Sequence, residues 1–305
     1  MFNSKTLFFS ALIIVLSFSA CKKHSDDDDV VGPGIQPYPD SSKWISEIIE
    51  YRPAPGQFIN TASGTMTAAN SIVGGEGLVS LGGFGGYIIF RFDHSVQNIE
   101  GYDFAIKGNA FDGSSEPGIV MVSFDTNGNG LPDDEWYEIA GENHANAEKD
   151  YTIIYKKPSQ TDESEDIFWE STDGTNGYIY TENLESFHSQ SFWPLFLSGE
   201  NLIFSGTCLG NLVEERENGD YYLAAAGKGY ADNFSEEYTY VVNGDEDTYL
   251  SNKFDISDAV DALGRKANLK AIDFIKVYTG VNQQAGHLGE LSTEIRGAIS
   301  FTVKN

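Results

Sequence analysis

The chain has 305 residues, of which 40% are hydrophobic, so it can bury a sizeable core in one large β domain or two modest ones. Its 19 Lys and Arg side chains stand against 46 Asp and Glu, which gives a formal net charge of −27. No run of basic residues offsets this charge, which excludes nucleic acid as a partner and disfavours direct docking onto anionic lipid.

The first residues are typical of an export signal. Lys5 precedes an apolar stretch over residues 7–18, and Ser19-Ala20 lead into Cys21. A short apolar segment that ends in small residues is a secretory signal peptide and is too short to span a membrane. The cysteine directly behind it indicates a bacterial lipobox, so we expect residues 1–20 to be removed and Cys21 to be lipidated. An ordinary signal peptide with an incidental cysteine is the alternative.

An acidic run and a linker follow. Ser25–Asp29 resembles the acidic export signal of Bacteroidota surface lipoproteins, which implies a lipid-anchored protein on the outer face of the outer membrane. A solvated acidic tether on a periplasm-facing lipoprotein is the alternative. Residues 30–40 hold three prolines and two glycines, as a linker does. We therefore assign 21–40 to the anchor, export signal and linker, and 41–305 to one β-sandwich domain, with two fused sandwiches as the alternative.

The body of the chain alternates short apolar runs with turn residues. Apolar residues at i, i+1, i+4 and i+5 predict a helix over 42–49, and a capping residue and a terminal glycine predict a second over 255–264. Runs rich in β-branched and aromatic residues predict strands at 87–92, 118–124, 151–155, 202–204, 238–242, 274–278 and 298–303. Because no helices alternate with these strands, we expect an all-β, antiparallel sandwich or jelly-roll-like fold with two short helices.

One segment has the spacing of a calcium loop. Oxygen-bearing side chains stand at its positions 1, 3, 5 and 9, and Gly130 at position 6 permits a sharp turn. These residues are Asp125, Asn127, Asn129 and Asp133, and Leu131 can offer its carbonyl. Position 12 is Trp136, so Asp134, Glu135 or a remote carboxylate must complete the shell. The segment predicts a structural calcium site, with a metal-free Gly/Asn-rich hairpin as the alternative.

Signatures of catalysis are missing from the sequence. It has no Gly-x-Ser-x-Gly elbow, no Walker loop and no His-Glu-x-x-His motif. Residues 82–86 are rich in glycine but precede a predicted strand, so a tight turn is expected there and not a nucleotide loop. Cys208 lies in an apolar run without a neighbouring histidine, as a buried structural thiol would. We therefore expect a protein that is not an enzyme, although pairs of carboxylates suited to glycoside hydrolysis are not excluded.

Aromatic residues in polar stretches give a further indication of function. On a β-sandwich, aromatic side chains in loops commonly line sites for sugars or planar ligands. The candidates are Trp136, Phe168, Trp169, His188, Phe192 and Trp193. Filling of gaps between loops and core is the alternative for each of them.

Several motifs together resemble a family of uncharacterised Bacteroidota cell-surface lipoproteins. They stand at residues 80–86, 108–111, 116–120, 125–138, 278–282 and 289–290. The family is similar to accessory binding proteins of outer-membrane uptake systems for glycans or for corrinoids such as cobalamin. The resemblance implies capture of an extracellular ligand and its transfer to a TonB-dependent transporter. In its pattern Asn109 and Glu116 flank the calcium loop, which makes them candidates to complete its shell. A secreted glycan-active hydrolase and a structural cell-adhesion module are the alternatives.

Overall fold

The fold is known from a computed structural model, which describes residues 40–75, 77–161, 164–182, 184, 189–243 and 247–303. Within them, antiparallel sheets dominate and form an all-β sandwich, as predicted. No helix in these ranges is long and apolar enough to cross a membrane. Cys21, Ser25–Asp29 and His188 lie outside the described residues.

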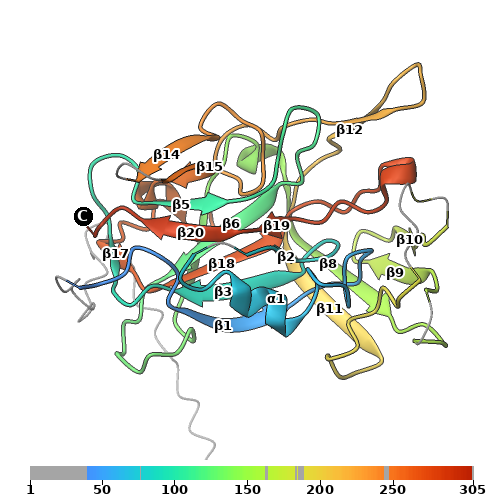
Figure 1. Cartoon of the computed structure of the whole chain (residues 1–305), viewed down its shortest axis with the longest axis horizontal. Helices are drawn as coiled ribbons and strands as arrows, with labels where there is room; N and C mark the ends of the chain where they lie inside the picture. The colour runs from blue at the N-terminus through green and yellow to red at the C-terminus, as the bar shows by residue number, and fades with distance from the viewer. Residues whose placement is uncertain are drawn as a thin grey trace, which may run out of the picture.

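A six-stranded sheet forms the centre of the molecule (Figure 1). Its strands, in spatial order, are β1 (Glu47–Arg52), β3 (Tyr87–Arg91), β18 (Phe274–Thr279), β6 (Gly118–Ser123), β7 (Trp136–Ile139) and β16 (Ala259–Val260). Side chains alternate between its two faces because successive residues of a strand point to opposite sides. Ile88, Val120 and Val277 face one core, whereas Ile119 and Tyr278 face the other.

Two four-stranded sheets supply the partners of those cores. The first consists of β14 (Thr239–Asn243), β15 (Asp247–Phe254), β5 (Phe104–Lys107) and β20 (Gly297–Ser300). Its residues Phe104 and Phe254 stack at 5.2 Å in the core with Ile88. The second consists of β10 (Asn176–Ile179), β9 (Ile167–Ser171), β8 (Glu148–Lys156) and β11 (Asn201–Cys208). Its inward residues, such as Tyr155, share the core with Tyr278.

Short elements complete the structure. Three two-stranded ribbons pair β12 (Val213–Glu215) with β13 (Tyr221–Leu223), β17 (Ala271–Ile272) with β4 (Val96–Gln97), and β19 (Glu294–Ile295) with β2 (Val79–Ser80). The α-helix α1 (Met66–Ser71) was not predicted; Thr65 caps it, and its Ala68 and Ala69 enter the first core. The 3-10 turns are η1 (His144–Asn146), η2 (Ile256–Asp258) and η3 (Gly286–Leu288).

All seven predicted strands are confirmed, but both predicted helices are wrong in detail. Residues 47–49 of the first predicted helix belong to β1, whose register against β3 shifts between Ile48 and Glu50. Ile45 and Ile48 both contact the first core, so their three-residue spacing, which suggested a helix, comes from the entry into this strand. In the second, Asp255 does cap a turn, but only η2 is helical before β16 begins at Ala259.

Candidate functional site

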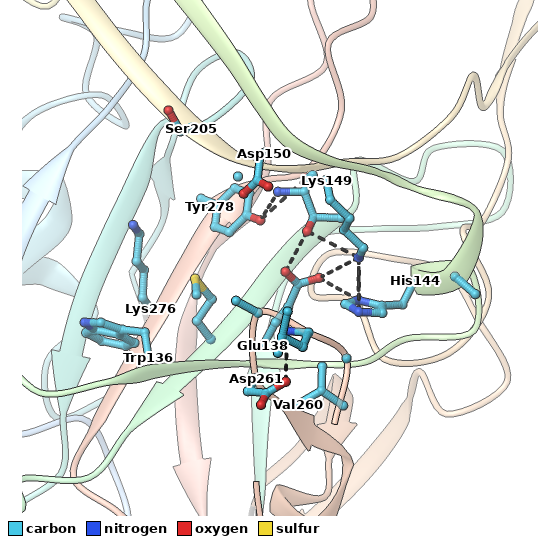
Figure 2. Close-up of a pocket in the computed structure, with 17 residues that line it drawn as sticks. Trp136, Glu138, His144, Lys149, Asp150, Ser205, Val260, Asp261, Lys276 and Tyr278 are labelled. Carbon is cyan, nitrogen blue, oxygen red and sulfur yellow. Dashed lines mark hydrogen bonds and ion pairs between the residues drawn. The ribbon is translucent and has the colours of Figure 1, made fainter. Parts of the chain in front are cut away.

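A cavity of about 640 Å³ opens between the central sheet and the ends of β8 and β11 (Figure 2). Ligand sites typically occupy cavities of this size, with apolar walls and a few polar groups. We name it the Trp136 pocket and define it by Trp136, Glu138, His144, Lys149, Thr207, Lys276 and Tyr278, together with the loop at 260–264.

Strand register brings three of its side chains into one row. Lys276 on β18 pairs with Met121 on β6, and Met121 pairs with Glu138 on β7. Directly paired residues of antiparallel strands share a face of the sheet. Trp136 and Tyr278 lie two residues from members of this row and therefore point to the same face. This face of the sheet thus supplies residues to the pocket wall at Trp136, Glu138, Met121 and Lys276, and Tyr278 lies between the pocket and the second core.

Glu138 is the centre of a polar network on one side of the pocket (Figure 2). Its Oε1 accepts a hydrogen bond from Nδ1 of His144 at 2.8 Å, and its Oε2 accepts one from Oγ1 of Thr207 at 2.7 Å. Nζ of Lys149 lies 3.0 Å from both ring nitrogens of His144 and 3.8 Å from Oε1 of Glu138. Burial lowers the pKa of Lys149, although the Glu138 carboxylate acts in the opposite direction. The carboxylate is therefore well compensated and acts as a fixed part of the wall.

Thr207 reaches Glu138 because β11 is irregular at this point. The register against β8 shifts between Gly206 and Cys208, and the backbone N–H of Thr207 instead donates to the hydroxyl of Tyr278 at 2.8 Å. A Cβ on Gly206 would lie 2.7 Å from the same hydroxyl, so only glycine allows this approach. Through this hydrogen bond, the bulge connects the sheet that contains β8 and β11 to the central sheet at the rim of the pocket.

Lys276 lies on the other side of the pocket, the side that also holds Trp136 (Figure 2). Its Nζ lies 4.2 Å from the ring centre of Tyr87 and 5.8 Å from that of Tyr278. Burial lowers the pKa of Lys276, and the charge of Glu50 only partly opposes this. Trp136 is held in place by its own loop, since its Nε1–H donates to the carbonyl of Pro132 at 3.3 Å. One side of the pocket thus presents the ring of Trp136 and the ammonium group of Lys276, and the other side presents the polar network around Glu138.

The predicted calcium loop connects β6 to β7, and its oxygen-bearing side chains converge. Asp125 accepts hydrogen bonds from the N–H groups of Asn129 and Gly130, and Gly130 has a φ of +74°. Nδ2 of Asn129 lies 3.0 Å from a carboxylate oxygen of Asp133. An amide rotation would turn an oxygen inward instead, so the donor set suits a hard cation.

The ends of the calcium loop differ in what they contribute. Asp134 accepts a hydrogen bond from Nδ2 of Asn127 at 3.3 Å and another from the backbone N–H of Thr126 at 3.2 Å, so its carboxylate lies with the other side chains of the loop. Glu135 instead accepts a hydrogen bond from the hydroxyl of Tyr137 on β7 and does not join the converging side chains of the loop. Leu131 is 55% exposed, and its N–H donates to Oδ1 of Asn129. The structure therefore separates Glu135 from the other predicted ligands.

Asn109 and Glu116 do not complete this loop, so their predicted place in its shell is wrong. Glu116 precedes β6 and Asp125 follows it, and six strand residues separate the two by roughly 20 Å. Glu116 instead forms a cluster with Asp232 and Glu294, and the backbone N–H of Asn109 donates to Asp232. Burial raises the pKa of each carboxyl in this cluster, and the like charges of neighbouring carboxylates add to the shift for Glu116 and Asp232.

The predicted aromatic ligand site is divided among different places. Trp136 lines the Trp136 pocket, while Trp169 lines a smaller cavity of about 150 Å³ that also contains the buried Glu290. Phe168 on β9 packs against Tyr178 on the neighbouring strand β10, with ring centres 5.3 Å apart.

Two of the predicted aromatic contacts are wrong. Phe192 and Trp193 are 0% and 1% exposed and belong to the second core, because their loop packs beneath the sheet rather than at the surface. The backbone carbonyls of Ser191 and Trp193 both accept hydrogen bonds from Asn60, which holds the loop inward.

The sequence did not reveal the rest of the pocket wall. Glu138, His144 and Lys149 lie close together in the sequence without a motif that marks them, and Thr207 joins them only through long-range pairing. Lys276 left a signal, since it interrupts the apolar run 274–278 at a position that faces away from Ile275 and Val277. Cys208 was predicted as a structural thiol, and burial raises its pKa to about 12, which makes it a poor nucleophile. In comparisons with known proteins, no family model and no curated protein matches this chain.

Proposed function

We propose that the protein is a surface-exposed lipoprotein that binds an extracellular glycan in the Trp136 pocket, as an accessory to nutrient uptake across the outer membrane. The observation that carries the proposal is the placement of Trp136 across a cavity of about 640 Å³ from a network of hydrogen-bonding side chains. Sugars present apolar ring faces and hydroxyl groups at once, so an aromatic platform next to polar side chains complements them.

Binding without turnover is the activity that this arrangement favours. Glu138 is engaged by His144 and Thr207, and Asp261 by Arg265 at 2.7 Å. Carboxylates that are already held by several donors have few free lone pairs with which to approach a glycosidic oxygen or a water molecule. Incubation with glycans that bind should therefore release no shorter products.

The proposed location rests on the lipobox at Cys21 and on Ser25–Asp29. A lipid on Cys21 would anchor the protein, and a TonB-dependent transporter would receive the ligand. Protease added to intact cells should degrade the protein, and replacement of Cys21 by alanine should release it from the membrane. Resistance to the protease in intact cells would argue for a periplasm-facing lipoprotein.

Substitution of the pocket tryptophan tests the function. We expect W136A to weaken binding of a glycan found on an array by about tenfold or more, because an aromatic platform is lost. The matched control is W169A, since Trp169 lines the separate, smaller cavity. Isothermal titration calorimetry of the variants measures the effect, and near-ultraviolet circular dichroism verifies their folding. Binding that survives W136A unchanged would contradict the proposal, as would selective binding of cobalamin in the same screen.

We also propose that the loop at Asp125–Asp134 binds calcium in a structural role. Asp125, Asn127, Asn129, Asp133 and Asp134 would be its ligands, because their side chains converge. The ion would neutralise their charges and fix the β6–β7 connection from which Trp136 emerges.

A further inference from the structure

The charges on the wall of the Trp136 pocket are unevenly compensated. Glu138 is engaged by His144, and Asp261 pairs with Arg265. Asp150 is exposed at the rim and remains solvated. Lys276, in contrast, has no carboxylate of the described residues within ion-pair distance, although the whole chain carries a net charge of −27.

The surroundings of Lys276 explain why no carboxylate pairs with it. Glu50 is the carboxylate whose charge acts on Lys276, but its side chain accepts a hydrogen bond from the hydroxyl of Tyr87. Two tyrosine rings cover the ammonium at 4.2 and 5.8 Å, and Met121 stands beside it in the register of the sheet. Aromatic faces attract a cation but supply no hydrogen-bond acceptor. The ammonium group therefore faces the cavity with donors that have no acceptor among these neighbours.

We propose that the ligand of the Trp136 pocket carries an oxyanion, which forms an ion pair with Lys276 while its sugar ring packs on Trp136. The proposal deepens the function proposed above and rests on it. It names the ligand class as an acidic glycan whose anionic group is a carboxylate, a sulfate or a phosphate. Hydrogen bonds between ionised partners are the stronger kind, and the partly desolvated setting enhances them. Burial also lowers the pKa of Lys276, so an anion that restores a counter-charge relieves a cost already present in the free protein.

The test compares matched charged and neutral glycans on the full protein. An array that holds uronates with their methyl esters, and sulfated and phosphorylated sugars with their unmodified forms, identifies the ligand and the source of its anion. Calorimetry then measures the charged and neutral member of the selected pair on wild type, K276M, K276R and W136A. K266M is the matched control, because Lys266 pairs with Asp258 and its loss changes the net charge equally.

We expect K276M to weaken binding of the acidic glycan by about 10- to 100-fold and to weaken binding of its neutral form at least tenfold less. K276R should retain much of the affinity, and K266M all of it. K276M should fold at least as stably as wild type, because an apolar side chain replaces a desolvated cation. Equal affinity of wild type and K276M for an acidic glycan would overturn the proposal, as would selection of neutral glycans only. In both cases a loss of glycan binding in W136A would still support the glycan site itself. The absence of any glycan ligand would instead overturn the proposed function together with this inference.

Discussion

At the scale of single residues, the pocket depends on the ways in which its charged groups are held. Glu138 receives donors from β11 and from η1, so one carboxylate connects three segments of the chain. Thr207 is buried, and its hydroxyl points to Glu138 only because the bulge in β11 places it there. A buried charge that loses one of its donors is costly, since the remaining atoms must satisfy it alone.

Replacement of Thr207 by valine tests this role. T207V keeps the shape of the side chain and removes the hydroxyl that donates to Glu138 at 2.7 Å. We expect the free energy of unfolding to fall by about 1.5 to 3 kcal/mol, the range for hydrogen bonds to charged groups. Urea unfolding measures it. The matched control is T152V on β8, whose exposed hydroxyl contacts Ser205, and it should change stability by less than about 0.5 kcal/mol. Equal effects of the two substitutions would show that Thr207 has no special role.

At the scale of elements, the sequence reveals regular strands and conceals irregular ones. The run at 118–124 predicted β6 because its branched side chains alternate between two apolar faces. Alternation is lost in β1, where the register shifts next to the residues that suggested a helix, and the bulge in β11 left no local signal at all. The calcium-loop pattern is local and could be found, whereas the pocket joins β7, β8, β11 and β18 across the chain. Spacing along a sequence reports neighbours within an element, and long-range register decides which elements meet.

The loop between β6 and β7 carries the prediction that belongs to this scale. If calcium binds its converging oxygens, a chelator should lower the melting temperature of wild type, because the ion stabilises only the folded loop. D125N should melt at a lower temperature in calcium and should respond less to the chelator. Differential scanning calorimetry measures both. D112N, which alters a carboxylate outside the loop that contacts Tyr222, should respond to the chelator as wild type does. A wild-type melting temperature that is equal in calcium and in chelator would contradict the site.

At the scale of the whole molecule, the distribution of acid groups matters more than their number. Most carboxylates of this strongly acidic chain lie at the surface, but some are enclosed by the two cores. Burial raises the pKa of Asp103 to about 6 and that of Glu290 from its ordinary 4.5 to about 8. Glu290 accepts the backbone N–H of Gln57 at 2.6 Å through one oxygen, and its other oxygen has no partner among the described residues. The folded state thus favours the protonated form of this side chain.

This preference makes stability depend on pH in a defined direction. Between about pH 4.5 and 8 the folded protein holds a proton on Glu290 that the unfolded chain has released. Because the folded state binds more protons in this window, the free energy of unfolding should fall as the pH rises through it. Urea titrations at pH 5, 6, 7 and 8, all in chelator so that no metal competes, should show this decline. E290Q should make it shallower, since a neutral amide does not titrate, whereas the raised pKa values of Asp103 and of the cluster of Glu116, Asp232 and Glu294 keep part of the decline. E236Q should keep the wild-type slope, because the salt bridge with Lys228 lowers the pKa of the exposed Glu236 and moves its titration below the window. A wild-type stability that rises from pH 5 to pH 8 would mean that Glu290 is ionised in the folded protein, and that a cation or a rearranged donor compensates it.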